Sequence, residues 1–238
     1  MPTVWLIRHG ESQSNAGEQT LCPEFTGLTK RGAKQAECVA TAFTRPPSLV
    51  ITSKYIRAQK TAEPTIRRFP NTKYQQWEVV REFTYLSWSN SSSMTMEERR
   101  PKVDNFWERN DPNHWDGDGA ETFIQFASRV SGVLERLRYR EEDFIAVFTH
   151  GQFMQAVLWL LKTPPSKIDP DSMRRFKEQL ETISIPNGAI LPIKLQGRRE
   201  TVVGDIKVSH LSQLEENQPL GKLYQMSEDI RSFASTKC

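Results

Sequence analysis

The chain has 238 residues, of which 37% are hydrophobic and 26% are charged, and its formal net charge at pH 7 is +3. This length can bury a substantial core and favours one large domain over two equal ones. The near balance of 32 basic and 29 acidic residues gives little support to nucleic-acid binding, which usually needs a clustered basic face. The apolar runs are much shorter than a membrane span. We therefore expect a soluble globular protein without a nucleic-acid or membrane partner.

The beginning of the chain and its cysteines predict the compartment. Met1-Pro2-Thr3 leads into the first apolar run without the features of a signal peptide. The cysteines are odd in number and lack metal-ligand spacing; they are Cys22, Cys38 and Cys238. We therefore expect a cytoplasmic protein with reduced thiols.

The first part of the chain alternates strand-like and helix-like segments. Val4 to Ile7 predicts a buried strand, because its apolar run is continuous and a glycine follows soon after. Thr29 can cap a helix whose apolar positions keep helical spacing. Leu49 to Ile51 predicts a second strand, and Ser53 can cap the helix that follows it.

The remainder of the chain continues this alternation. Further strands are predicted over residues 74–80, 144–148, 189–195 and 202–208, and further helices over residues 121–139 and 151–161. Alternating elements of this kind predict an α/β fold, namely a three-layer sandwich in which helices cover both faces of a mostly parallel central sheet.

One stretch, residues 89–119, interrupts the alternation. It contains a serine run, a segment from Met94 to Arg109 with helical character, and the polar segment Asp111 to Trp115. We expect an insertion that forms a partly helical lid within a single domain spanning residues 1–238.

Tryptophans and paired arginines are conspicuous in and around this stretch. Trp88, Trp107 and Trp115 lie in or beside it, and tryptophans more often anchor packing than define specificity. The arginine pairs are scattered along the chain as Arg67-Arg68, Arg99-Arg100 and Arg198-Arg199. We expect these pairs to be solvated surface.

Polar side chains follow the predicted strands at their carboxyl ends. Arg8 and His9 follow the first strand, and His150 follows the fourth. Arg57 lies in the first turn of a helix after another strand, and Glu82 follows the third. Because α/β sheets bind ligands at the carboxyl ends of their strands, we expect these side chains to share one pocket.

Such a pocket suits an anionic phosphoryl group. Arginines bind phosphate oxygens bidentately, Asn15 can donate an amide hydrogen bond, and backbone N–H groups near Gly10 and Gly151 can approach closely. A neutral imidazole can attack phosphorus, and the neighbouring positive charges should lower the pKa of His9. A carboxyl group facing a phosphate dianion favours its protonated form, which would let Glu82 donate a proton to the leaving oxygen.

A metal site is the rival interpretation of the two histidines. Zinc sites need further ligands at compact spacing, and neither His9 nor His150 has one in register apart from Glu11. The stretch "DGDGAE" is partly similar to a calcium loop, but Ala120 and Ala127 stand at two ligand positions. We therefore expect no metal.

Five motifs resemble the histidine phosphatase superfamily, the phosphoglycerate-mutase-like group. "LIRHGESQSN" is similar to its signature, and "LTKRGAKQA", "TSKYIRAQKTA", "GAETFIQFASRV" and "FTHG" follow in the family's order. "SIPNGAILPIKL" also resembles the penultimate strand of the family. The resemblance extends from about Val4 to Leu211, with a gap over the insertion.

This resemblance implies a phosphoglycerate-mutase-like fold and a metal-independent phosphomonoester hydrolase that acts through a phosphohistidine. The implied catalytic residues are His9 as nucleophile, Glu82 as general acid, and His150; the implied phosphate-binding residues are Arg8, Asn15, Arg57, His150 and Gly151. The resemblance implies no cofactor, and a small phosphorylated molecule or a phosphopeptide as substrate. Monomer and homodimer both remain open.

The chain departs from the family pattern around Glu82, where "REFTYLSWSNSSS" has serines in place of glycines. Glu78, within the predicted third strand, and Glu121, at the head of a helix, are the competing acids, and we favour Glu82 as the general acid.

Two alternative functions remain open. They are phosphoglycerate mutase-type phosphoryl transfer and a non-catalytic phosphate-binding regulatory domain. The blocks typical of cofactor-dependent mutases are missing from "FTYLSWSNSSS" and "ISIPNGAILPI", so a phosphatase is favoured.

Overall fold

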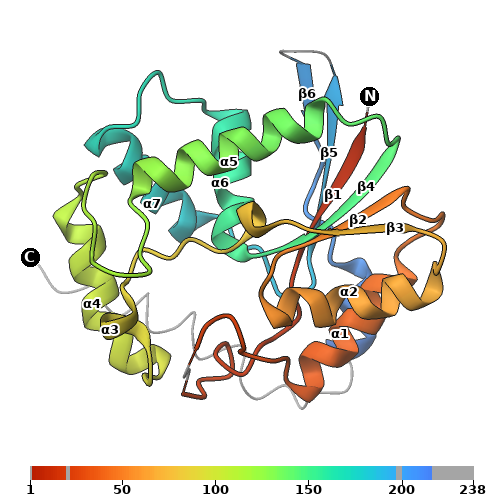
Figure 1. Cartoon of the computed structure of the whole chain (residues 1–238), viewed down its shortest axis with the longest axis horizontal. Coiled ribbons are helices and arrows are strands. Elements are labelled where there is room, and N and C mark those ends of the chain that lie inside the picture. The colour runs from red at the N-terminus through yellow and green to blue at the C-terminus, as the bar shows by residue number, and fades with distance from the viewer. Residues whose placement is uncertain (1, 20–21, 197–199, 216–238) are drawn as a thin grey trace, which may run out of the picture.

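A six-stranded sheet with the strand order β3-β2-β4-β1-β5-β6 forms the centre of the computed structural model, which describes residues 2–19, 22–196 and 200–215 (Figure 1). The strands are β1 Thr3–Arg8, β2 Leu49–Thr52, β3 Lys73–Gln76, β4 Phe144–Thr149, β5 Ile190–Gln196 and β6 Glu200–Val203. The four strands β1, β2, β3 and β4 pair with one another in parallel, whereas β5 pairs antiparallel with both β1 and β6. The mostly parallel sheet is therefore confirmed.

Helices cover both faces of this sheet. The α-helices are α1 Lys30–Thr41, α2 Ile56–Arg68, α3 Trp88–Ser91, α4 Met96–Arg109, α5 Phe123–Arg138, α6 Gly151–Lys162, α7 Pro170–Thr182 and α8 Ser212–Glu215, and 3-10 turns lie at η1 Glu78–Val80 and η2 Ser209–Leu211. Figure 1 shows α1 and α2 on one side of the sheet, and α5, α6 and α7 on the other. The predicted three-layer α/β sandwich is confirmed.

Alternating side chains of the strands build two separate cores. Ile7 and Val50 pack with residues of α1 and α2, whereas their neighbours Leu6 and Ile51 pack in the larger core under α5, α6 and α7. Strand side chains point alternately to opposite faces, so a continuous apolar run buries both faces. This explains why β1, β2 and β4, which lie inside the sheet, contain so few polar residues.

Helix starts follow local capping signals. The Thr29 side chain accepts a hydrogen bond from Gly32 N and begins α1 as predicted. α5 begins with a capping box between Thr122 and Gln125. The unpredicted α7 has the same signal, because Asp169 and Ser172 form a capping box and Pro170 stands at its first position.

Three predicted boundaries are wrong. α2 begins after Tyr55, which has no side-chain cap, so Ser53 does not cap this helix. β3 ends at Gln76 because its neighbour β2 ends at Thr52, the register partner of Gln76, and the chain then turns into η1. β6 ends at Val203 rather than near residue 208, although Lys207 forms an isolated bridge with Ile190.

Residues 89–119, the stretch predicted to be an insertion, are partly helical. α4 begins with a capping box between Thr95 and Glu98 and ends at Arg109, where Asn110 caps it with a φ of 49°. Trp107 packs in the larger core, which confirms its predicted anchoring role. Trp88 and Trp115 are instead 49% and 57% exposed.

Two further sequence expectations concern the thiols and the membrane. Cys22 and Cys38 are free thiols, whereas Cys238, like Arg198 and Arg199, lies outside the described residues. Among the helices described, none is both long and apolar enough to cross a membrane.

Candidate active site

His9 and His150 lie side by side at the carboxyl ends of β1 and β4. The two strands are in parallel register with Arg8 opposite Thr149, so the histidine that follows each strand arrives at the same edge. The centroids of the two imidazole rings are 5.2 Å apart, and both side chains are buried. The predicted convergence of the histidines is confirmed.

The surroundings of His9 favour a neutral ring with a lone pair on Nε2. His9 Nδ1 lies 2.7 Å from the Gly10 carbonyl oxygen, a distance that suits an N–H donor at Nδ1. Arg57 Nε donates to His9 Nε2 at 3.1 Å. Burial, followed by the charges of Arg57 and Arg8, holds the pKa of His9 well below its ordinary value of 6.5.

Two glycines let the loop after β1 touch the start of α1. A Cβ on Gly10 would lie 2.4 Å from the carbonyl oxygen of Gly32, and a Cβ on Gly32 would lie 2.0 Å from that of Glu11. Gly10 N also donates to Thr61 Oγ1 at 3.0 Å. The backbone that follows His9 is therefore fixed by contacts that only glycine permits.

Two guanidinium groups border His9. Arg57 donates to the Pro23 carbonyl oxygen at 2.6 Å, and burial lowers its pKa to about 10, although the charge of Glu82 opposes this. Arg8 donates to the Ile185 carbonyl oxygen, while its buried Nε has no partner among the described residues. A Cβ on Gly151 would lie 3.2 Å from Arg8 Nε, so the glycine at the start of α6 makes room for this guanidinium.

Ser53 holds His150 and was missed by sequence reasoning as a site residue. His150 Nε2 lies 2.8 Å from Ser53 Oγ, and its buried Nδ1 has no partner in the described part of the chain. Burial, followed by the charge of Arg57, holds the pKa of His150 well below 6.5. The signal for Ser53 was its position directly after β2, which lies beside β4.

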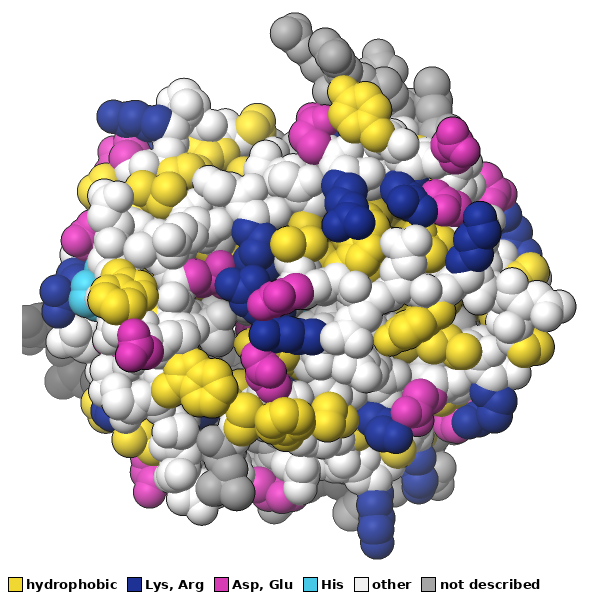
Figure 2. All heavy atoms as spheres, viewed as in Figure 1, with side chains coloured by type: hydrophobic (Ala, Val, Ile, Leu, Met, Phe, Trp, Pro, Cys, Tyr) yellow, Lys and Arg dark blue, Asp and Glu magenta, His cyan; other side chains and the backbone are white. Residues whose placement is uncertain are grey.

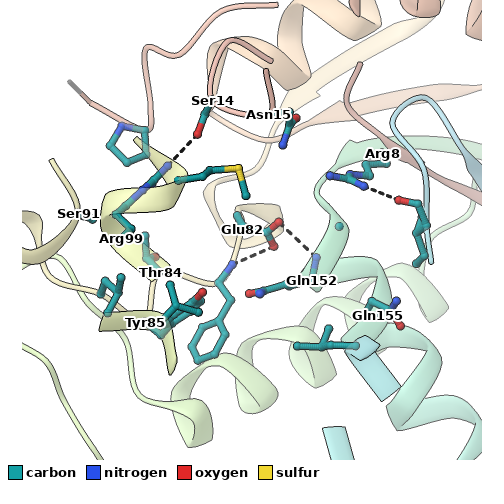
Figure 3. Close-up of a pocket in the computed structure, with 18 of the residues that line it drawn as sticks. Arg8, Ser14, Asn15, Glu82, Thr84, Tyr85, Ser91, Arg99, Gln152 and Gln155 are labelled. Atoms are coloured by element: carbon teal, nitrogen blue, oxygen red, sulfur yellow. Dashed lines mark hydrogen bonds between the residues drawn. The ribbon is translucent and has the colours of Figure 1, made fainter. Parts of the chain in front are cut away.

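Asn15 is oriented by the loop before β5. Its Oδ1 accepts hydrogen bonds from Ser12 N, Ser12 Oγ and Asn187 Nδ2 at 3.0 to 3.2 Å. With its oxygen engaged, the amide nitrogen of Asn15 points toward the cavity (Figure 3). Asn187 also donates to the His9 carbonyl oxygen at 3.0 Å. The sequence signal for Asn187 was the "PNG" in "SIPNGAILPIKL", a motif that we interpreted only as a strand.

Glu82 lies at the amino end of α6. Its Oε1 accepts hydrogen bonds from the backbone N–H groups of Phe83 and Phe153 at 3.1 Å, and its Oε2 accepts one from Gln152 at 3.3 Å (Figure 3). The carboxyl group thus satisfies the free N–H groups of the first turn of α6. It lines the same cavity as Arg8 and Arg57.

The competing acids are engaged elsewhere. Glu78 lies in η1 rather than in a strand, and its exposed carboxylate pairs with Lys54 at 3.1 Å. Glu121 is buried and pairs with Arg129, and with Arg81 at 3.3 Å. Neither acid lines the cavity.

Arg129 fixes the segment that carries Glu82. Besides its ion pair with Glu121, it donates to the carbonyl oxygens of Val79 and Arg81 at 2.9 Å and of Glu82 at 3.3 Å. The Arg129 side chain is 8% exposed and that of Glu121 is 7% exposed. The position of Glu82 therefore depends on a buried ion pair one layer behind the cavity.

The cavity has a volume of about 500 Å³ and is lined by all the predicted phosphate-binding residues except His150. The buried His9 and His150 lie behind this lining and are not part of it. The insertion supplies further lining residues, which are Ser91, Met96, Arg99 and Val103. The expectation that Arg99 is solvated surface is wrong, whereas Arg100 is exposed. Helical spacing alone could not tell which side of α4 faces the cavity.

Hydrogen bonds also join the insertion to the loop that follows β1. Arg99 donates to Ser14 Oγ at 3.0 Å, and Gln19 Nε2 donates to the Ser93 carbonyl oxygen at 2.6 Å. The insertion therefore borders the cavity, while its movement as a lid stays a prediction.

Charge elsewhere on the described surface is mixed. On the face shown in Figure 2, Lys and Arg side chains lie beside Asp and Glu side chains. Over residues 2–19, 22–196 and 200–215, no group of three or more His, Cys, Asp or Glu side chains could hold a metal ion. The concentration of arginine inside the cavity is thus a local feature.

The chain is similar to several known phosphatases. A family model described as the histidine phosphatase superfamily, branch 1, matches residues 4–203. The adenosylcobalamin/alpha-ribazole phosphatase of Escherichia coli is 30% identical over 178 residues, which cover 73% of this chain and 84% of that protein. Phosphoserine phosphatase 1 of Hydrogenobacter thermophilus is 26% identical over 158 residues, which cover 66% of this chain and 74% of that protein.

A solved structure shares the fold. The phosphoserine phosphatase of Entamoeba histolytica, in complex with 3-phosphoglyceric acid, superposes with a TM-score of 0.67 at 20% identity, over 89% of this chain and 100% of that chain. The sheet and its helices are therefore those of the phosphoglycerate-mutase-like fold. Because the family model spans most of its length, the chain belongs to branch 1 of the histidine phosphatase superfamily and is a phosphomonoester hydrolase.

Proposed function

We propose that the protein hydrolyses a small phosphomonoester through a phosphohistidine at His9 Nε2. The observation that carries this proposal is the neutral His9 ring, whose Nε2 lone pair faces Arg57 beside a cavity lined by Arg8 and Glu82. The phosphatase names of its relatives support a small phosphorylated substrate.

In the first step the Nε2 lone pair forms a bond to phosphorus, and the bond between phosphorus and the ester oxygen breaks. Before this attack Arg57 turns its Nε–H from His9 Nε2 to a phosphoryl oxygen, which frees the lone pair, and Arg8 offers its unpartnered Nε–H to the same phosphoryl group. His150 and the Asn15 amide contact the remaining oxygens. Fixed donors of this kind stabilise the charge that spreads over the transferring group.

Glu82 moves the protons of both steps. In its protonated form it gives a proton to the departing ester oxygen, which leaves as an alcohol. In the second step the carboxylate takes a proton from water, the water oxygen bonds to phosphorus, and the electrons of the P–N bond return to Nε2. The first step therefore requires Glu82 in its protonated form, and the second requires the carboxylate.

The test is hydrolysis of p-nitrophenyl phosphate by the full chain without added metal and in the presence of a chelator. We expect phosphate release by the wild type, none by His9→Ala, and an acid-labile phosphate on His9 after rapid quenching. His114→Gln is the matched control, because the His114 ring contacts Phe106 and Asp116 rather than the residues around His9, and should be dispensable. Full activity of His9→Ala would refute the nucleophile, and binding without turnover by the wild type would favour a regulatory domain.

A further inference from the structure

Arg99 is a cation of the cavity wall without an acidic partner among the described residues. It comes from α4 in the insertion, is half-buried, and lines the cavity. Its Nε donates to the Thr95 carbonyl oxygen at 3.2 Å and its terminal nitrogen donates to Ser14 Oγ at 3.0 Å. Both partners are neutral, so the charge of Arg99 is not compensated within the described protein.

The surroundings of Arg99 favour its charge less than water does. Burial lowers the pKa of Arg99, which means that the site favours the charged guanidinium less than water does. A half-buried cation of this kind gains from an anion that replaces its lost hydration. The bonds to Thr95 and Ser14 use only part of its donors, because a guanidinium has five N–H groups.

Arg99 and Arg8 lie on different sides of the cavity. Figure 3 shows Arg99 and Ser14 on one side and Arg8 on the other, with Glu82 between them. Glu82 is the one acidic residue among the described residues that line the cavity, which also holds three arginines. Its carboxyl oxygens already accept three backbone N–H groups. When Glu82 is protonated, as the proposed first step requires, the three guanidinium charges exceed the charge of a phosphoryl dianion by one.

The wall also includes apolar side chains. It contains Leu86, Val103, Leu180 and Ile183. A short hydrocarbon segment can contact such side chains while charged groups at its two ends meet arginines.

We infer that the substrate is a phosphomonoester whose organic part ends in a second anionic group, a carboxylate or another phosphoryl group, which Arg99 binds. This inference rests on the proposed function, since it assumes that the other end is the phosphoryl group transferred to His9. It also predicts poor turnover of esters that end in an ammonium group, because no free carboxylate lines the described cavity.

The test compares kcat/KM of the full-length protein for a matched series of esters. Propyl phosphate ends in a methyl group, 3-(phosphooxy)propanoate in a carboxylate, propane-1,3-diyl bisphosphate in a second phosphoryl group, and 3-(phosphooxy)propylamine in an ammonium group. We expect the wild type to prefer at least one of the two doubly anionic esters over propyl phosphate by about tenfold or more. Which of the two is preferred identifies the second group.

Arg99→Gln should reduce the ratio of kcat/KM for the preferred doubly anionic ester to kcat/KM for propyl phosphate to about one. Arg100→Gln, at an exposed neighbour on the same helix, should leave this ratio unchanged. Arg99→Glu should invert the order so that the ammonium ester is preferred. A wild type that does not distinguish doubly anionic esters from propyl phosphate overturns the inference even if no variant folds. So does a ratio that survives in a folded Arg99→Gln variant.

Failure of this inference is distinguishable from failure of the proposed function. Hydrolysis of propyl phosphate by the wild type and its loss in His9→Ala report on the phosphohistidine alone. The change in the ratio between esters from the wild type to Arg99→Gln reports on Arg99.

Discussion

Replacement of Arg129 by methionine tests whether the buried layer behind the cavity positions Glu82. The change removes a guanidinium that serves Glu121 and the carbonyl oxygens of Val79, Arg81 and Glu82. Methionine keeps an apolar stem of similar length, so the loss is mainly of charge and of hydrogen-bond donors.

The expected loss of stability can be estimated from burial. The side chains of Arg129 and Glu121 are 8% and 7% exposed, and removal of one partner of such a pair costs about 3–5 kcal/mol of the free energy of unfolding. Domains have free energies of unfolding of about 5–15 kcal/mol, so the variant should still fold, with a lower denaturation midpoint. Denaturant unfolding followed by circular dichroism measures this loss.

A second change separates stability from positioning. Glu121→Leu combined with Arg129→Met removes the unpaired carboxylate as well, so much of the lost stability should return. The Glu82 carbonyl oxygen would still lack its donor, and the segment that carries the general acid would still be less fixed.

Leaving-group dependence then reports on Glu82. In the double variant kcat should fall about tenfold or more for propyl phosphate but less for p-nitrophenyl phosphate, whose leaving oxygen needs little protonation. A stable double variant that hydrolyses both esters at wild-type rates would refute the positioning role. A loss below about 1 kcal/mol in Arg129→Met would refute the estimate for the buried pair.

Two further predictions concern the buried histidines and the close backbone contact. Since the pKa values of His9 and His150 are held well below 6.5, the unfolded chain binds protons that the folded chain does not, and the free energy of unfolding should fall with decreasing pH. The fall should approach about 1.4 kcal/mol per pH unit for each histidine between about pH 6 and the folded-state pKa values, and denaturant unfolding that is independent of pH there would contradict neutral imidazoles. Gly32→Ala would place a Cβ 2.0 Å from the Glu11 carbonyl oxygen, so it should lower the free energy of unfolding by about 1–3 kcal/mol and reduce activity. Gly132→Ala, which has open space around it in α5, should leave stability unchanged or raise it. Thermal unfolding of both variants measures the difference. Equal melting temperatures for the two alanine variants would contradict this reading of the contact.

Local patterns predicted most of the elements and part of the site. The apolar runs of β1 and β4 end at Arg8 and Thr149, so the histidines at their carboxyl ends could be placed at one sheet edge. Capping at Thr29 was equally local. These features depend on neighbouring residues in the chain, which is why the sequence alone reveals them.

Features that depend on which strands pair with each other were predicted less well. The end of β3 is set by the length of β2, and the role of Ser53 is set by the strand that β2 lies beside. α7 was not predicted, although Asp169 and Pro170 are ordinary signals for the start of a helix. The sequence therefore contained enough information to predict this helix.

The sequence by itself determined the alternation of strands and helices, the delivery of His9 and His150 to one edge of the sheet, and the family to which the chain belongs. Tertiary structure alone decided that Arg129 supports Glu82 and that Arg99 faces the cavity while Arg100 faces solvent. The physical reason is that secondary structure follows from contacts between near neighbours. The surroundings of a charge are fixed only when segments distant in the chain, here α4, α5 and the loop after β1, pack against one another.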